Sequence, residues 1–276
     1  MTRFAVVLFN LGGPDGPDAV QPFLFNLFND PAIIGAPGPI RWLIAKLIST
    51  RRAPVARQIY AHLGGGSPLL PNTEAQARAL AAALGADASV FIAMRYWAPR
   101  ATETAAKVKA FAPERIVLLP LYPQFSTTTT GSSLDDWRRA AAAVGLNAPT
   151  SALCCYPVQA GFIAALAAAI RPALEAARAH GTPRLLLTAH GLPKKIVATG
   201  DPYQVQVEQT AAALVAALGI GGLDWTVCYQ SRVGPLEWIG PATDDEIRRA
   251  GRDRVPVVIA PIAFVSEHSE TLVELG

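Results

Sequence analysis

The chain has 276 residues, 51% of them hydrophobic and 16% charged, which is enough apolar material for one large domain or two of ordinary size. A net charge of +3 and scattered basic residues argue against a nucleic-acid-binding protein. Three cysteines provide no disulfide framework, and no apolar run reaches the ~20 residues that span a bilayer. Because the apolar run at residues 4–9 is also too short for a signal peptide, we expect a cytoplasmic protein, at most peripheral to a membrane.

Strand-like apolar runs alternate with helical patterns in the first half of the chain. The runs cover residues 4–9, 89–94 and 116–121. The helical patterns cover residues 18–29, 40–48, 54–63 and 73–84. We expect Asn72 or Thr73 to cap the last of these helices at its N-terminus and Gly85 to cap its C-terminus.

A hydroxyl-rich stretch follows the third run and includes four consecutive threonines, Thr127 to Thr130. A helix is expected to begin near Leu134, so the backbone N–H groups of this stretch could hold an anion. A solvated strand-to-helix turn explains the same pattern, and the sequence does not choose between the two.

The second half repeats the alternation. Its runs cover residues 151–155, 184–188, 225–229 and 255–260, and its helical patterns cover residues 159–179, 203–218 and 244–250. Strands that alternate with helices of this length indicate βαβ units and parallel sheets. We therefore predict an α/β protein with two lobes, each a parallel sheet flanked by helices, and a cleft between them. The N-terminal lobe should span residues 1–150 and the C-terminal lobe residues 151–276.

Two polar clusters follow apolar runs of the second lobe. His190 comes directly after the run at 185–189, and Glu267, His268 and Glu270 follow the run at 257–265. Because the carboxyl ends of parallel strands meet at one edge of a sheet, we expect these groups at the same edge. An imidazole that faces carboxylates can bind a divalent cation, shuttle protons, or do both. The other two histidines, His62 and His180, lie in helical patterns and are interpreted as surface or packing residues.

A series of short motifs resembles the ferrochelatases, the enzymes that insert ferrous iron into a porphyrin in haem synthesis. The motifs occur in order through nearly the whole chain: Asn10-Leu-Gly-Gly-Pro14, Arg51-Arg-Ala-Pro54, Ile59-Tyr60, Gly64-Gly-Gly-Ser-Pro68, Met94-Arg-Tyr-Trp97, Leu121-Tyr-Pro-Gln124, Thr130-Gly-Ser-Ser133, Ala189-His-Gly-Leu-Pro193, Gly200-Asp-Pro-Tyr203, Gln230-Ser-Arg-Val-Gly-Pro235, Trp238-Ile-Gly-Pro241 and Ser266-Glu-His-Ser-Glu-Thr-Leu272. The resemblance implies two Rossmann-like lobes with the macrocycle bound in the cleft.

The resemblance also implies roles for individual residues. The invariant histidine of the family falls on His190 and its catalytic glutamate on Glu270, the two expected metal residues, with Glu267 and His268 in support. Seven positions match residues that line or support the porphyrin site: Leu11 over one macrocycle face, Arg52 near the propionates, Tyr60, Ser67, Arg95, Tyr96 and Trp238.

The chemistry of the residues agrees with this expectation. Metal insertion removes two pyrrole N–H protons and strips water from Fe²⁺. A neutral imidazole accepts a proton near neutral pH, and carboxylates offer hard oxygen ligands and a second proton route. The sequence leaves open which of His190 and Glu270 takes the protons and which delivers the metal.

The expected substrates are protoporphyrin IX and Fe²⁺, with iron as substrate and no cofactor required. Some relatives hold a [2Fe–2S] cluster with four cysteines, but only Cys154, Cys155 and Cys228 are present, so we expect no cluster. A chelatase for coproporphyrin, for another tetrapyrrole or for another metal remains an alternative. Because family members continue beyond the Glu270 motif, we expect an incomplete second lobe, and a non-catalytic porphyrin-binding chain is the alternative from another class.

The surroundings of the enzyme are less constrained by sequence. The apolar helix at residues 40–48 carries Arg41 and Lys46, and in the resemblance this region forms a lip over the porphyrin pocket. It could rest on a membrane or pack on the first lobe. The sequence is compatible with a monomer or a homodimer.

Overall fold

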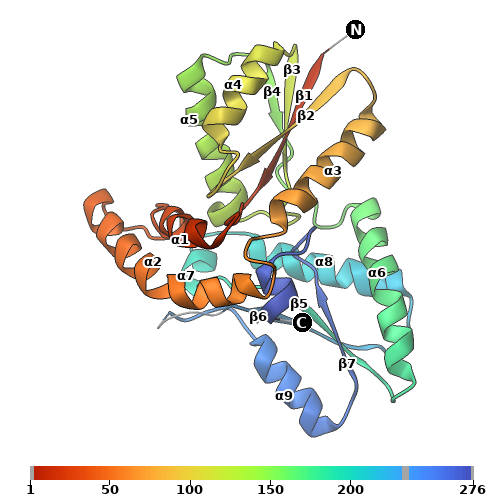
Figure 1. Cartoon of the computed structure of the whole chain (residues 1–276). Helices are drawn as coiled ribbons and strands as arrows, with labels where there is room; N and C mark the ends of the chain where they lie inside the picture. Colours follow the sequence, from red (N-terminus) through yellow and green to blue (C-terminus); the bar gives the residue numbers. More distant parts are fainter. Residues whose placement is uncertain (1–2, 232–235, 275–276) are drawn as a thin grey trace. The chain divides into compact units, whose positions relative to one another are not determined.

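The computed structural model describes residues 3–231 and 236–274, without the side chains of residues 270 and 274. The chain forms two compact units (Figure 1). Unit 1 contains residues 3–122, 127–154 and 266–274, and unit 2 contains residues 123–126 and 155–265. Each unit is built around its own parallel sheet. The predicted α/β class with two parallel sheets flanked by helices is confirmed.

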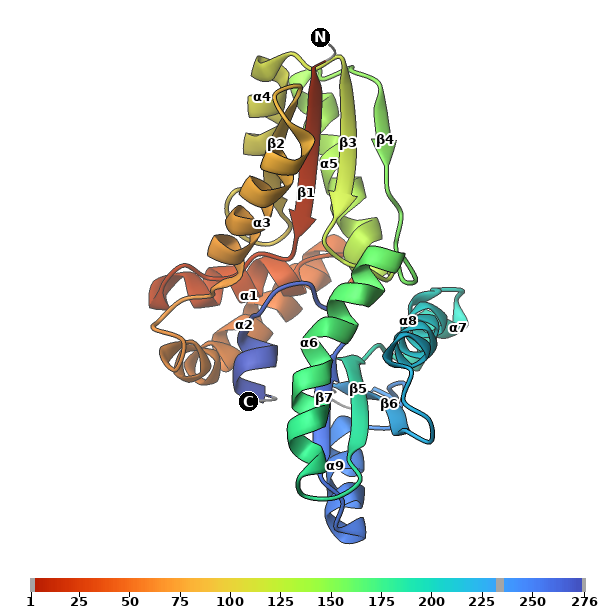
Figure 2. The same ribbon diagram turned by 90° about the vertical axis from the view of Figure 1, so that its right-hand side faces the viewer.

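The sheet of unit 1 has four parallel strands in the order β2-β1-β3-β4, visible side by side in Figure 2. They are β1 (Phe4–Asn10), β2 (Ala88–Met94), β3 (Arg115–Pro120) and β4 (Thr150–Ala152). Strand β1 is buried on both faces. Its Val7 and Phe9 pack with α4 (Ala101–Phe111) and α5 (Ser132–Val144), whereas Val6 and Leu8 pack with α3 (Leu69–Leu84).

The region between β1 and α3 corrects one prediction. After a short 3-10 turn (Pro17–Ala19), α1 spans Val20–Phe28 and α2 spans Gly38–Ala61. The two helices expected at residues 40–48 and 54–63 are therefore one helix with Pro54 inside it. Proline removes one backbone hydrogen bond, but Ala45, Ser49, Ala53 and Tyr60 form a buried stripe on both sides of it. Packing of this continuous stripe overrides the local helix-breaking signal.

The sheet of unit 2 has three parallel strands in the order β6-β5-β7. They are β5 (Arg184–His190), β6 (Asp224–Gln230) and β7 (Val257–Pro261), with helices α6 (Ala160–Arg178), α7 (Lys194–Ala198), α8 (Tyr203–Leu218) and α9 (Thr243–Asp253). Leu185, Leu186 and Leu187 of the central strand are fully buried, as expected for a parallel strand covered on both faces. The core of unit 2 joins this strand to Val207 and Leu214 of α8.

The segment that follows β7 differs from the sequence-based expectation. Strand β7 ends at Pro261, and residues 266–274 belong to unit 1 rather than to a second lobe that starts at residue 151. The side-chain amide of Asn72 in α3 donates to the carbonyl of Glu267 over 3.2 Å. Glu267 and His268 therefore group with unit 1, whereas His190 belongs to unit 2.

Other differences are local. Helix α3 begins at Leu69, three residues before the expected cap Asn72, and Thr73 donates to the carbonyl of Leu69 inside the helix. Helices α4 and α7 were not anticipated. The threonine stretch is a π-helical turn, Thr127–Gly131, with Thr128 and Thr130 buried, so of the two alternatives the fully solvated turn is wrong.

Among the described residues, one helix, α6, has the length and apolar composition of a membrane span. That evidence is weak because core helices of soluble proteins pass the same test. Ile163, Ala167, Ile170 and Leu174 of α6 are buried, and the last three belong to the hydrophobic core of unit 2. The helix is thus amphipathic rather than buried all round.

Candidate functional site

The first group of candidate residues lies just beyond the ends of β1 and β2 in unit 1. The backbone N–H groups of Arg95 and Tyr96 donate to the carbonyls of Asn10 and Leu11, each over 2.9 Å. The two segments therefore stay hydrogen-bonded beyond Asn10 and Met94, the last residue pair of β1 and β2. Leu11 then packs with the buried rings of Tyr60 and Tyr96 in one apolar group, which we call the aromatic cluster (Leu11, Tyr60, Tyr96).

Ser67 is positioned by close backbone approach. Its N–H donates to the carbonyl of Pro14 over 2.7 Å, which brings the glycine-rich turn against the loop after β1. A Cβ atom at Gly13 would overlap the Cβ and Oγ atoms of Ser67. Gly64 and Gly65 both have positive φ angles of 82° and 96°, which glycine adopts without strain.

Arg95 is held inside unit 1 rather than exposed. Its guanidinium donates to Ser132 Oγ over 2.7 Å and to Asp30 Oδ2 over 2.8 Å, and its side chain is only 9% exposed. The hydroxyl of Tyr96 donates to the same Asp30 oxygen over 2.7 Å. The structure thus favours support over direct lining for Arg95, and it reveals Asp30 and Ser132, which the sequence analysis did not select.

The electrostatics of this group are consistent with an ionised Asp30. Burial raises the pKa of the Asp30 carboxyl, but hydrogen bonds from Ser132, the backbone of Ala32 and Tyr96, together with the Arg95 charge, outweigh it and lower the pKa below its usual range. Burial and the Asp30 charge raise the pKa of Tyr96 far above its usual range. Asp30 is therefore an anion and Tyr96 a neutral donor near neutral pH.

Helix α2 supplies two more candidates with different environments. Tyr60 is buried in the aromatic cluster. Arg52 is exposed, and its guanidinium lies 5.8 Å from the centre of the Phe28 ring. An exposed cation beside an apolar cluster is suited to the carboxylate edge of an amphipathic ligand.

The acidic segment of unit 1 is described only in part. Glu267 is exposed, and His268 is half-buried with its backbone N–H donating to Thr271 Oγ1 over 3.0 Å. Residues Glu270–Glu274 form a π-helical turn. The side chain of Glu270 lies outside the described residues, as do Arg232 to Pro235 of the motif that follows Gln230.

His190 is the last residue of β5 in unit 2 and is half-buried. Its Nδ1 atom lies 2.6 Å from the carbonyl oxygen of Gly191. Because a carbonyl only accepts, Nδ1 carries the proton in the neutral imidazole, and the basic lone pair is on Nε2. The neighbouring strand brings Gln230 beside His190, and Thr188 donates to the Gln230 side chain over 3.0 Å.

Trp238 belongs to the same unit as His190. Its backbone pairs with Pro193, and the next residue, Ile239, donates to the carbonyl of Leu192 over 3.0 Å, so the segment is tied to the chain just after His190. The indole ring borders a pocket of about 710 Å³. The other lining residues are Lys194, Val197, Ala198, Gln204, Ile239, Gly240, Pro241, Ala242 and Asp245, and His190 is not among them.

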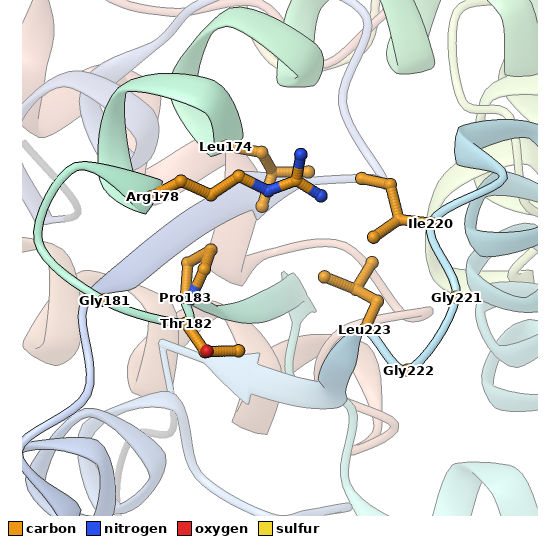
Figure 3. Close-up of a pocket in the computed structure, with 9 residues that line it drawn as sticks. All are labelled: Leu174, Arg178, Gly181, Thr182, Pro183, Ile220, Gly221, Gly222 and Leu223. Atoms are coloured by element: carbon orange, nitrogen blue, oxygen red, sulfur yellow. The ribbon is translucent and has the colours of Figure 1, made fainter.

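A second pocket in unit 2, of about 430 Å³, is shown in Figure 3. Its residues Pro183 and Leu223 immediately precede β5 and β6, which places the pocket at the amino ends of the strands. His190 is at the carboxyl end of β5, so this pocket is not part of its site. Among the side chains that the structure describes, no group of three His, Cys, Asp or Glu residues lies close enough together to hold a metal ion.

The fold and the candidate residues together define the structural class of the protein. The chain has two parallel-sheet α/β units, with a histidine at the end of one central strand and an aromatic cluster at the end of another. Comparison with known sequences then gives the family: a sequence model of the ferrochelatases matches residues 3–276. The chain therefore belongs to the ferrochelatase family, whose members insert metal into porphyrins.

Individual relatives agree. Ferrochelatases from Caulobacter vibrioides and Phenylobacterium zucineum are 62% and 60% identical over 278 residues, covering 99% of this chain and 79% and 80% of theirs. The ferrochelatase of Hyphomonas neptunium is 54% identical over 283 residues, covering 99% of this chain and 77% of the relative. A solved structure of a multi-domain Deinococcus radiodurans protein, described as similar to chelatases, covers 100% of this chain and 55% of its own at 16% identity. Its TM-score of 0.45 is too low to add to the fold described above.

The contact between Gly13 and Ser67 generates a stability prediction. We expect Gly13→Ala to lower the free energy of unfolding by about 1–3 kcal/mol, because the new methyl group overlaps Ser67. Gly16→Ala is the matched control, since nothing lies within 4 Å of a Cβ there and its φ of −176° is extended. Urea unfolding followed by circular dichroism measures both. Equal stability of the two variants would contradict the assigned role of Gly13.

Proposed function

We propose that this chain inserts Fe²⁺ into protoporphyrin IX to give protohaem, with release of two protons, as the terminal step of haem biosynthesis. The observation that carries the proposal is the match to the ferrochelatase family over residues 3–276, which includes every candidate residue. Support comes from His190, fixed at the end of a rigid buried strand with its basic lone pair on Nε2.

His190 has the properties that the reaction requires of a proton acceptor or an iron ligand. The neutral form of an imidazole accepts a proton through its unprotonated nitrogen, here Nε2, or binds Fe²⁺ through the same lone pair. The hydrogen bond to Gly191 fixes the tautomer and limits ring rotation. Both uses of Nε2 are compatible with the proposal.

The acidic segment provides the second group. In the proposal Glu270 is the catalytic glutamate, which accepts a proton or binds iron through a hard oxygen ligand. Glu267 and His268 support it. The anchoring of Glu267 through Asn72 favours a defined path for this segment in unit 1.

The porphyrin-binding surface of unit 1 is proposed to be the aromatic cluster together with Ser67, and that of unit 2 to include Trp238. In unit 1 the half-buried Leu11 suits the face of a macrocycle, with the buried rings of Tyr60 and Tyr96 packed behind it, and the exposed Arg52 suits a propionate. Arg95 supports this surface from behind, because its donors are already engaged by Asp30 and Ser132.

Iron is a substrate in this proposal, and no resident cofactor is part of it. The cysteines fit an iron–sulfur cluster poorly. Burial raises the pKa of the Cys228 thiol, whereas a cluster ligand must be a thiolate. Cys155 is half-buried and accepts a hydrogen bond from the side chain of Gln206 over 3.5 Å.

We also propose that the enzyme works in the cytoplasm and contacts the membrane surface through α2. Ile40, Leu43 and Leu47 are spaced along one helix face and are 53%, 63% and 51% exposed. Lys46 and Arg51 are exposed nearby, and cationic groups beside an apolar face favour an anionic lipid surface. The proposal is compatible with a monomer or a homodimer.

The first functional prediction tests the reaction and His190 together. The parent chain should insert Fe²⁺ into protoporphyrin IX faster than into coproporphyrin, measured by metalloporphyrin absorbance. His190→Ala should abolish insertion while porphyrin affinity, measured by fluorescence quenching, stays within about tenfold. His62→Ala and His180→Ala are controls on exposed histidines and should keep parental rates. Insertion by His190→Ala at near-parental rate would refute the role of His190.

The second functional prediction separates the two glutamates. Glu270→Gln keeps the shape but removes the charge, so turnover should fall at least about a hundredfold. Glu267→Gln should lose less, because Glu267 is exposed and acts in support. Steady-state insertion assays compare them. A larger loss at Glu267 would mean that the two roles are reversed.

The third concerns the membrane. Sedimentation with phosphatidylcholine vesicles that contain phosphatidylglycerol should capture the parent chain. The double variant Leu43→Asn/Leu47→Asn should bind at least about fivefold less, because it removes most of the exposed apolar face. Val205→Asn replaces an exposed residue of α8 and should bind as the parent does. Equal capture of all three proteins would exclude α2 as the contact.

A further inference from the structure

The carboxylate of Asp30 accepts hydrogen bonds from four donors. Its Oδ2 atom accepts from Arg95, from the Tyr96 hydroxyl over 2.7 Å and from Ser132 Oγ, and its Oδ1 atom accepts from the backbone N–H of Ala32 over 2.9 Å. The side chain is only 2% exposed. One buried anion therefore joins donors from three separate segments of unit 1.

Two of these donors, Arg95 and Tyr96, are also bonded through their backbone to the segment that carries Leu11. Arg95 and Tyr96 follow β2, and their backbone N–H groups hold Asn10 and Leu11 at the end of β1. The carbonyl of Tyr96 also accepts from the side-chain amide of Asn26 in α1, over 3.0 Å. A displacement of either side chain would therefore move the backbone that carries Leu11.

The backbone of Asp30 leads toward α2. The N–H groups of Ile33 and Ile34 donate to its carbonyl over 3.0 Å and 2.9 Å, forming a tight turn. Arg41, in the first turn of α2, donates to the carbonyl of Asn29 over 2.9 Å. The turn at Asn29 and Asp30 thus connects the start of α2, which carries Arg52 and Tyr60 further along, to the end of β2.

We propose that Asp30 is a positioning residue for porphyrin binding, which acts through Arg95 and Tyr96 on Leu11 and on α2 without touching the macrocycle. This inference rests on the proposed function, since it takes the aromatic cluster as the porphyrin surface. It assigns to Asp30 an effect on the porphyrin and none on iron. Ser132 belongs to the same device, because it bridges Arg95 Nε and the Asp30 carboxylate.

The chain offers a matched control. Asp136 is a second carboxylate beside Arg95, with Oδ2 at 3.6 Å from Nη1, but it is 21% exposed and also pairs with Arg139. It has the same charge and the same neighbour as Asp30, without the bonds to Tyr96 or to the turn before α2. Loss of Arg95 neutralisation alone would affect both variants alike.

The experiment compares Asp30→Asn with Asp136→Asn. Asp30→Asn should weaken protoporphyrin binding in fluorescence quenching by at least about tenfold and raise the porphyrin KM to match, with the iron KM within about twofold. Asp136→Asn should stay within about twofold for all three. Combining Asp30→Asn with Arg95→Gln should weaken binding no more than the larger single effect, because the two act as one unit.

Ser132→Ala carries the test if Asp30→Asn does not fold, since it removes one bond from the same carboxylate without a buried charge change. It should raise the porphyrin Kd by about threefold or more with the iron KM unchanged. A folded Asp30→Asn with parental porphyrin affinity, a loss confined to kcat, or additive losses with Arg95→Gln would each overturn the proposal. So would a Ser132→Ala variant with parental affinity where Asp30→Asn fails to fold.

Quenching needs no chemistry, so it separates this inference from the proposed function. A parent chain that binds porphyrin but forms no protohaem would refute the reaction and leave the Asp30 comparison readable. A parent chain that forms protohaem, with Asp30→Asn equal to it, would refute only the role of Asp30.

Discussion

The parallel order of both sheets is the constraint on which the candidate site depends. In a parallel sheet the carboxyl ends of all strands share one edge, so the residues that follow β1 and β2 are neighbours without any sequence proximity. Strands β1 and β5 are buried on both faces, and each buried leucine or valine contributes about 1.5–3 kcal/mol of transfer free energy. Leu11 and His190 therefore start from backbone that the cores of their units hold fixed.

The residues proposed for the chemistry are divided between the two units, and the division does not follow their order in the chain. Unit 2 supplies the imidazole of His190 and the indole of Trp238. Unit 1 supplies the aromatic cluster and also the segment with Glu267 and His268, because the chain returns to unit 1 after β7. Because this return follows the last strand, Glu267 shares a unit with the proposed porphyrin surface and not with His190.

Much of this could be predicted from sequence because the signals are local. The runs at residues 4–9 and 184–188 are short, apolar and rich in β-branched residues or leucine, and both lie within observed strands. The prediction of two helices in place of α2 was wrong for the opposite reason. The helix-breaking signal of Pro54 is local, whereas the buried stripe through Ala53 depends on packing against the rest of unit 1. The role of Asp30 could not be predicted from the sequence, since its side-chain donors Arg95, Tyr96 and Ser132 are 65 to 102 residues away in the chain.

The energetics of the Asp30–Arg95 pair argue for geometry rather than stability as its purpose. Burying an ion pair costs desolvation energy that its attraction often only offsets, and well-packed apolar replacements are frequently neutral or stabilising. A chain that needed only a stable core here could use apolar residues. What apolar packing cannot supply is direction: the guanidinium of Arg95 has Ser132 on Nε and Asp30 on Nη2, which leaves it one orientation. Because the backbone N–H groups of Arg95 and of the next residue, Tyr96, donate to Asn10 and Leu11, that single orientation is transmitted to Leu11, over which the macrocycle is proposed to lie.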